Sequence, residues 1–201
     1  MLCLCGDMSI QGSSNNGVTE LDILKILGND TIAERILHLL KKYHKSGIIP
    51  SKELDIEVLL SLEYFNLAFP TQSLDDSLSW DKRLSTICDM EIPYIIRFFF
   101  KEICQNGVAC WQDVVINYFN QIGESNGEDF IEIIQDILQR SNNLKISALE
   151  IVKISKKFNR DSGTLIAEMK GAGIISPKIT FLKRRRSTPI YEINRFISLT
   201  W

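Results

Sequence analysis

The densest positive charge in this 201-residue chain is a run of four consecutive cations, Lys183-Arg184-Arg185-Arg186. Lys and Arg side chains bind polyanions by neutralising phosphates and releasing the counterions condensed on them. Four adjacent cations cannot all be buried, and they exceed what the solubility of a turn requires. The run therefore predicts contact with phosphate groups, with a solubilising turn as the alternative.

More cations precede this run, and they divide the chain into two parts of opposite charge. Residues 144–201 contain 12 Lys and Arg but 4 Asp and Glu, a net charge of +8. Residues 1–143 carry a net charge of −10, so the total of −2 hides the difference. A basic segment next to an acidic one is typical of a polyanion-binding module attached to a partner-binding body.

Two helices are expected to position these cations. Ser147 is a good N-cap, and Glu150 three residues later predicts a capping box at the start of the first helix. Asn159-Arg160-Asp161 interrupts the helical pattern, and a second helix is expected from Ser162 until Gly173. The amides at its N-terminus suit a phosphate.

Two β-type runs follow the second helix, at 178–182 and 189–193, and the four-cation run lies between them. The order is helix, tight turn, helix and two-stranded wing, which resembles the winged-helix superfamily of helix-turn-helix domains. The resemblance is carried by Ser147–Phe158, Ala167–Ile175 and Ile190–Asn194, and with a preceding helix it covers about 127–201. It implies a second helix in the DNA major groove and a wing on the backbone or minor groove, although many members bind protein instead.

The outward face of the second helix carries few of the side chains that read bases. Gly163, Thr164, Ala167, Glu168 and Gly171 are expected there, whereas Arg, Lys, Asn and Gln make most specific base contacts. The module is therefore expected to bind DNA mainly through the backbone, unless another helix packs against this smooth strip. The predicted DNA-contacting residues are Lys153, Lys156, Lys157, Arg160, Ser162, Thr164, Lys170, Lys183, Arg184, Arg185 and Arg186.

The remaining residues predict a helical body of mostly α class. Residues 1–18 are expected to be a flexible lead-in, residues 19–126 a helical body with a linker at 71–82, and residues 127–201 the winged-helix domain. Helical periodicity, caps and glycines predict helices at 19–27, 31–46, 52–69, 83–89, 92–105, 109–122 and 127–140.

No motif in residues 1–143 has catalytic form: there is no phosphate-binding glycine loop, nucleophile elbow or paired metal-binding signature. The chain is therefore expected to be no enzyme and to need no cofactor or metal.

Its five cysteines lack framework spacing, which indicates a reducing compartment. Cys88, Cys104 and Cys110 are expected to be buried. Without a membrane span, the predicted location is intracellular, in the cytoplasm or nucleoid, or in the nucleus.

One apolar cluster predicts association of the body. Ile95, Ile96, Phe98, Phe99 and Phe100 exceed what one buried face of a helix can hide, so some must pack elsewhere in this chain or on another subunit. A homodimer or a protein partner is expected.

The function predicted is duplex DNA binding in transcription, chromosome maintenance or replication. The alternative is a structural subunit that uses the C-terminal domain for protein contacts.

Overall fold

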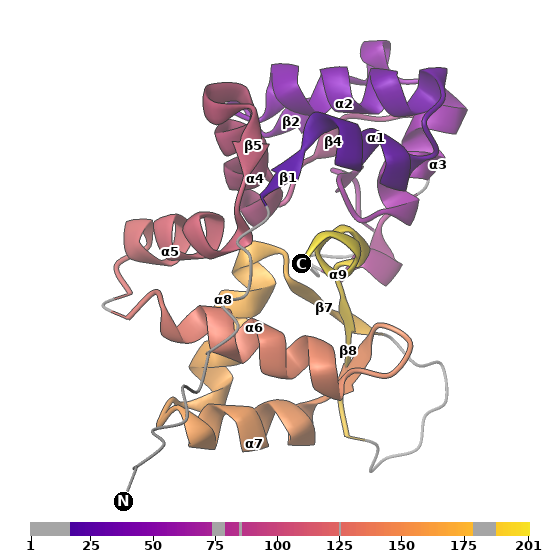
Figure 1. Cartoon of the computed structure of the whole chain (residues 1–201). Helices are drawn as coiled ribbons and strands as arrows, with labels where there is room; N and C mark the ends of the chain where they lie inside the picture. The colour runs from indigo at the N-terminus through magenta and orange to yellow at the C-terminus, as the bar shows by residue number, and fades with distance from the viewer. Residues whose placement is uncertain (1–16, 74–78, 85, 125, 179–187) are drawn as a thin grey trace, which may run out of the picture.

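The structure is a computed structural model that describes residues 17–73, 79–84, 86–124, 126–178 and 188–201 (Figure 1). Its helices are α1 (Glu20–Leu27), α2 (Thr31–Tyr43), α3 (Ile56–Tyr64), α4 (Tyr94–Asn106), α5 (Trp111–Gln121), α6 (Asp129–Arg140), α7 (Ala148–Lys157), α8 (Ser162–Ala172) and α9 (Arg195–Thr200). Its strands are β1 (Val18–Thr19), β2 (Ile48–Ile49), β3 (Phe69–Pro70), β4 (Met90–Glu91), β5 (Val108–Ala109), β6 (Lys145–Ser147), β7 (Ile175–Lys178) and β8 (Ile190–Ile193).

Local end signals explain most helix boundaries. Thr19 and Asp22 form a capping box at the start of α1, and Gly28 ends that helix with a φ of 117°. Ser147 accepts a hydrogen bond from the amide of Glu150 at 3.2 Å, as predicted. The carboxylate of Glu150 turns toward Lys153 instead of completing the expected box.

Two predicted helices are wrong. The segment predicted as one helix at 52–69 contains a 3₁₀ turn (Ser51–Glu53), then α3, which Asp55 caps, then strand β3. No helix lies in the described residues of 83–89. The predicted helix is not continuous through Asp55. The Asp55 carboxylate accepts a hydrogen bond from the Val58 amide at 2.9 Å, and this cap starts a new helix.

The predicted fold class is also wrong. The described residues are 59% helical with 14% strand, and their strands form three small antiparallel sheets, β1-β5, β2-β4-β3 and β6-β8-β7. It is a mixed α/β protein, not a mostly helical body followed by a winged-helix domain with a two-stranded wing. Five of the strands are two residues long, too short for an alternating pattern to reveal them. At the C-terminus, β6 adds a third strand by pairing with β8.

The two three-stranded sheets share one topology. In each, the first and second strands in sequence both pair with the third, and helical segments connect the first to the second. A helix precedes each sheet, α2 or α6, and a helix follows it, α4 or α9. The chain therefore repeats one arrangement at a distance that no short sequence period reveals.

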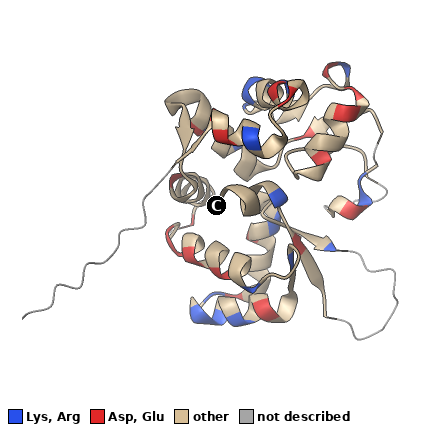
Figure 2. Ribbon diagram, turned by 45° about the vertical axis from the view of Figure 1, so that its right-hand side comes forward, with Lys and Arg blue, Asp and Glu red and all other residues tan. Residues whose placement is uncertain are grey.

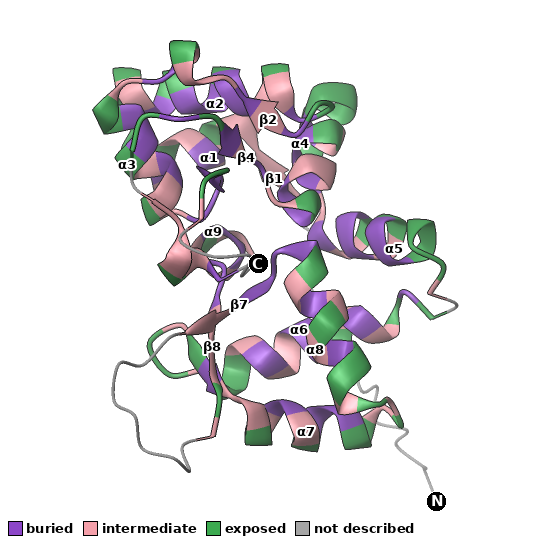
Figure 3. Cartoon of the chain, turned by 180° about the vertical axis from the view of Figure 1, so that it is seen from behind, coloured by how far each residue is buried: buried purple, intermediate pink, exposed green. Residues whose placement is uncertain are grey.

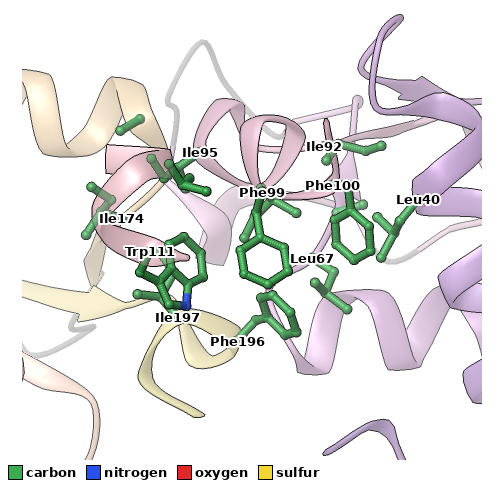
Figure 4. Packing of buried hydrophobic residues seen from close by; sticks show 14 of the residues in the cluster. Leu40, Leu67, Ile92, Ile95, Phe99, Phe100, Trp111, Ile174, Phe196 and Ile197 are labelled. Atoms are coloured by element: carbon green, nitrogen blue, oxygen red, sulfur yellow. The ribbon is translucent and has the colours of Figure 1, made fainter. Parts of the chain in front are cut away.

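A single hydrophobic core joins the two halves. Helix α9 lies between them (Figure 1), and its Phe196 is fully buried. The Phe196 ring lies 5.3 Å from Phe99 and 6.4 Å from Trp111, centroid to centroid (Figure 4). The C-terminal helix thus seals the interface between the α1–α4 half and the α6–α8 half.

The segment predicted as a linker at 71–82 is anchored where it is described. Ser79 Oγ donates to the carbonyl of Pro177 at 2.7 Å, and the Trp80 amide donates to Ser176 Oγ at 2.9 Å. Trp80 also stacks on Phe69. These contacts fasten the segment to β7, while residues 74–78 lie outside the described residues.

The apolar cluster of α4 is used within the chain. Ile95, Ile96, Phe99 and Phe100 are fully buried, and Phe98 packs partly buried against the core. Figure 4 shows Ile95, Phe99 and Phe100 within this packing. The packing that suggested self-association is therefore intramolecular, and the homodimer stays a prediction. Among the described residues no helix is long and apolar enough to cross a membrane.

Candidate nucleic-acid interface

The three predicted lysines of α7 differ in what they contact. Lys153 Nζ lies 2.5 Å from Glu150 Oε1, and Lys157 Nζ lies 3.2 Å from Asp136 Oδ2. Lys156 is exposed and forms no ion pair with any residue that the structure describes. Of these three lysines, Lys156 therefore offers its full charge to an external ligand. Figure 2 shows basic and acidic positions together on the helices in the lower part of the molecule.

Arg160 faces the interior. Its side chain is 17% exposed, and its Nη1 lies 2.8 Å from Glu124 Oε2. The guanidinium also lies over the ring of Phe130, 4.2 Å from its centroid. Arg160 therefore ties the turn between α7 and α8 to the start of α6, and a DNA contact would have to displace these partners.

Glu168 is turned away from the outward face on which it was predicted. Its side chain is 12% exposed, and its Oε2 lies 3.9 Å from Arg160 Nη1. Burial, and next the neighbouring carboxylate of Glu124, raise the pKa of Glu168 to about 7. The Glu168 carboxylate is therefore largely withdrawn from the surface of α8.

The N-terminus of α8 is already capped. Asp161, rather than Ser162, is the N-cap, and its Oδ1 accepts a hydrogen bond from the Thr164 amide at 2.8 Å. Thr164 Oγ1 donates to the same oxygen at 3.0 Å. These hydrogen bonds lower the pKa of Asp161. A carboxylate thus occupies the place expected for a phosphate, so the predicted anion site at Ser162 is not free.

The exposed face of α8 consists of small uncharged residues. Gly163, Thr164, Ala167 and Gly171 are exposed there, as predicted. Figure 3 shows several exposed positions in green along α8. Lys170 is half-buried at one edge, where it lines a cavity of about 190 Å³ with Trp80 and Tyr94. This face can approach another macromolecule closely, and the exposed Asp161 carboxylate lies at its N-terminal end, beside Gly163 and Thr164.

Folding neutralises much of the charge separation seen along the sequence. Lys178 Nζ lies 3.0 Å from Asp81 Oδ1 and 3.0 Å from Glu192 Oε2. Lys157 and Arg160 likewise pair with Asp136 and Glu124 of the acidic part. The predicted contacts Lys183, Arg184, Arg185 and Arg186 lie outside the described residues.

Sequence reasoning missed a second set of cations, which lies in the acidic part of the chain. Lys45, Arg97 and Lys101 line a cavity beside α4. A signal for it exists in the sequence, because Tyr94, Phe98, Lys101 and Gln105 recur at spacings of three and four residues and so share one helix face. Cys104, predicted to be buried, is exposed on this face.

Comparison with known proteins assigns the chain to a family. No curated protein and no solved structure matches the chain. The model of an uncharacterized protein family matches residues 21–200, nearly the full length. The chain therefore belongs to that family.

Proposed function

We propose that the protein is an intracellular, non-enzymatic protein that binds duplex DNA mainly through its backbone. The observation that carries the proposal is the exposed face of α8, where Gly163, Thr164, Ala167 and Gly171 lie open to solvent and Glu168 is turned inward. A helix face without bulky side chains can lie close to a phosphate backbone.

The charge to hold the duplex would come from a reduced set of the predicted cations. Lys156 supplies an exposed ammonium on α7, and Lys170 supplies a half-buried one at the edge of α8. The run at 183–186 supplies four more charges in sequence. Lys153, Lys157 and Arg160 contribute less, because each already lies beside a carboxylate.

A duplex titration of the full-length protein tests the proposal. Binding of a random-sequence duplex should weaken steeply between two salt concentrations, since each neutralised phosphate contributes about 0.9 to the salt slope. Replacing Arg184, Arg185 and Arg186 with Ala should flatten that slope by roughly 2–3. Lys156→Glu should weaken binding, whereas Lys52→Glu, at an exposed residue of the 3₁₀ turn, should not. Absence of duplex binding at low salt contradicts the proposal.

A structural-subunit role is favoured by a different surface. Ile56, Leu60 and Tyr64 are 50%, 51% and 62% exposed and recur every four residues along α3. An apolar stripe of this kind is typical of a protein contact, here a second copy of the chain. Light scattering at micromolar concentration should give a dimer mass that Leu60→Glu reduces to a monomer mass. A monomer in the unaltered protein would contradict the homodimer.

A further inference from the structure

A cavity of about 470 Å³ lies along one face of α4. The turn that follows α2 contributes Lys45, and the end of α5 contributes Gln121. Its volume falls in the range of small-molecule and cofactor sites. The cavity belongs to the α1–α5 part of the chain and is separate from the exposed face of α8.

The lining that the described residues give this cavity is basic. Lys45, Arg97 and Lys101 line it together with His44, and no carboxylate of the described ranges does. None of these three cations forms an ion pair within the described ranges, in contrast to Lys153, Lys157, Arg160 and Lys178. Glu20, whose charge acts on Cys104 at this cavity, is already paired with Lys41 at 2.5 Å. The cavity therefore retains a positive potential that suits an anion.

Arg97 is held in place before any ligand arrives. Its Nε donates to the carbonyl of His44 at 3.1 Å, and its Nη2 donates to the carbonyl of Lys45 at 2.9 Å. These bonds cover the carbonyls at the C-terminal end of α2, whose partial negative charge would otherwise repel an anion. Nη1 has no hydrogen-bond partner in the described part of the chain. Because the two carbonyls hold the guanidinium in a fixed geometry, Nη1 can donate to a phosphate.

Aromatic and amide side chains share the cavity with these cations. Tyr94 is 51% exposed and carries Arg97 over one face of its ring, 4.8 Å from the centroid. Phe98 is held edge-on against Tyr118, with centroids 5.5 Å apart. Gln105 and Gln121 add hydrogen-bond donors and acceptors. Stacking surfaces beside cations are the features that bind unpaired bases together with their phosphates.

We propose that this cavity binds a nucleotide unit, with its phosphate on Arg97, Lys101 and Lys45 and its base against Tyr94 and Phe98. The unit is either a free nucleotide or an unpaired nucleotide of a nucleic-acid strand, since both present the same phosphate and base. An acidic peptide would use the cations but leave the rings without a stacking partner. Intact duplex has its bases stacked inside and cannot offer one. The proposal does not rest on duplex binding by the α7–α8 face.

Calorimetric titration of the full-length protein distinguishes the sources. The probes are ATP, a single-stranded oligonucleotide, inorganic phosphate and a poly-Glu peptide. We expect ATP or the oligonucleotide to bind more tightly than phosphate or poly-Glu. Binding of ATP identifies free nucleotide as sufficient, and binding of the oligonucleotide alone identifies the strand as the ligand. Binding of neither, or tighter binding of phosphate or poly-Glu, overturns the proposal.

Variants locate the binding in the cavity. Tyr94→Ala should weaken binding about tenfold, the scale of losing one stacked base. Lys101→Glu should weaken it at least as much, because it reverses a charge beside the phosphate. Both residues are on the surface side of α4, and circular dichroism checks that each variant folds. Lys52→Glu is the charge control, since this exposed residue does not line the cavity. Unchanged binding by folded Tyr94→Ala and Lys101→Glu overturns the assignment.

Discussion

Asn194 donates a hydrogen bond to Asn66, 128 residues earlier in sequence, and so links the two halves of the molecule. Asn194 Nδ2 donates to the carbonyl of Asn66 at 2.9 Å, and Asn66 Oδ1 accepts from the amide of Arg195 at 2.9 Å. Asn194 is fully buried and also donates to the carbonyl of Gly173 at 3.1 Å. The pair joins the end of α3, the end of α8 and the start of α9 at one point.

Replacing Asn194 with Ala should lower the free energy of unfolding by about 2–4 kcal/mol, because it leaves buried carbonyls of both halves without donors. It also removes the cap on the Ile197 amide. Urea unfolding followed by circular dichroism measures the loss. Asn117→Ala, at an exposed position of α5, is the control and should change stability by less than about 0.5 kcal/mol. Equal losses in the two variants would contradict a structural role for Asn194.

Phe196→Ala should lower the free energy of unfolding by about 3–5 kcal/mol, the usual cost of removing a buried Phe. The ring is 0% exposed and packs against Phe99 and Phe100 of α4. Since α9 contacts both halves, the variant should still unfold in one transition with a lower midpoint. Leu199→Ala, in the same helix at a 52% exposed position, should have little effect. A loss below about 1 kcal/mol at Phe196 would show that α9 does not seal the core.

Glu168→Gln should stabilise the protein at pH 8 and change its stability much less at pH 5. The pKa of Glu168 is raised to about 7 in the folded state, chiefly by burial and by Glu124. The folded state therefore keeps a proton that the unfolded state releases, and stability falls as the pH rises from about 4.5 through 7. Gln resembles the protonated acid and removes this loss, which amounts to about 1–3 kcal/mol.

Chemical unfolding at a series of pH values checks the Glu168 prediction. The other groups around Glu168 are Arg160 and Tyr118. The pKa of Tyr118 is raised to about 12 by burial, and that of Glu124 is lowered, chiefly by its hydrogen bond from Arg160, so neither titrates between pH 5 and 8. Glu57→Gln, on the exposed side of α3, is the control. If the stability of the unaltered protein and that of Glu168→Gln changed with pH in the same way, the ionisation of Glu168 would not cause the change.

Gly47→Ala should destabilise the protein more than Gly107→Ala. Both glycines have a left-handed backbone, with φ of 75° and 73°, so each substitution costs about 1–2 kcal/mol for the conformation alone. A Cβ at Gly47 would also lie 2.7 Å from the Arg97 guanidinium carbon, whereas one at Gly107 would meet nothing within 4 Å. The difference between the free energies of unfolding of the two variants measures the cost of the contact with Arg97. If both variants lost the same free energy of unfolding, that contact would not contribute.

The sequence by itself determined the positions of most helices. Caps such as Thr19 and Ser147 and terminal glycines such as Gly28 act within one turn of the backbone, so residues close in sequence carry the whole signal. The exposed strip of α8 was predictable for the same reason, because helical spacing places its small residues on one face.

Only the tertiary structure decided which strands pair into sheets and which charged side chains remain free to bind a ligand. Strands such as β2 and β4 are two residues long and exist because Ile49 pairs with Met90, some forty positions away. Arg160 reads as a DNA contact in sequence, yet Glu124 and Phe130 hold it in the interior. Arg97 reads as an ordinary helix residue, yet two carbonyls of the turn after α2 aim it into a cavity. Pairing between distant residues depends on which surfaces meet after the helices pack, and no local pattern encodes it.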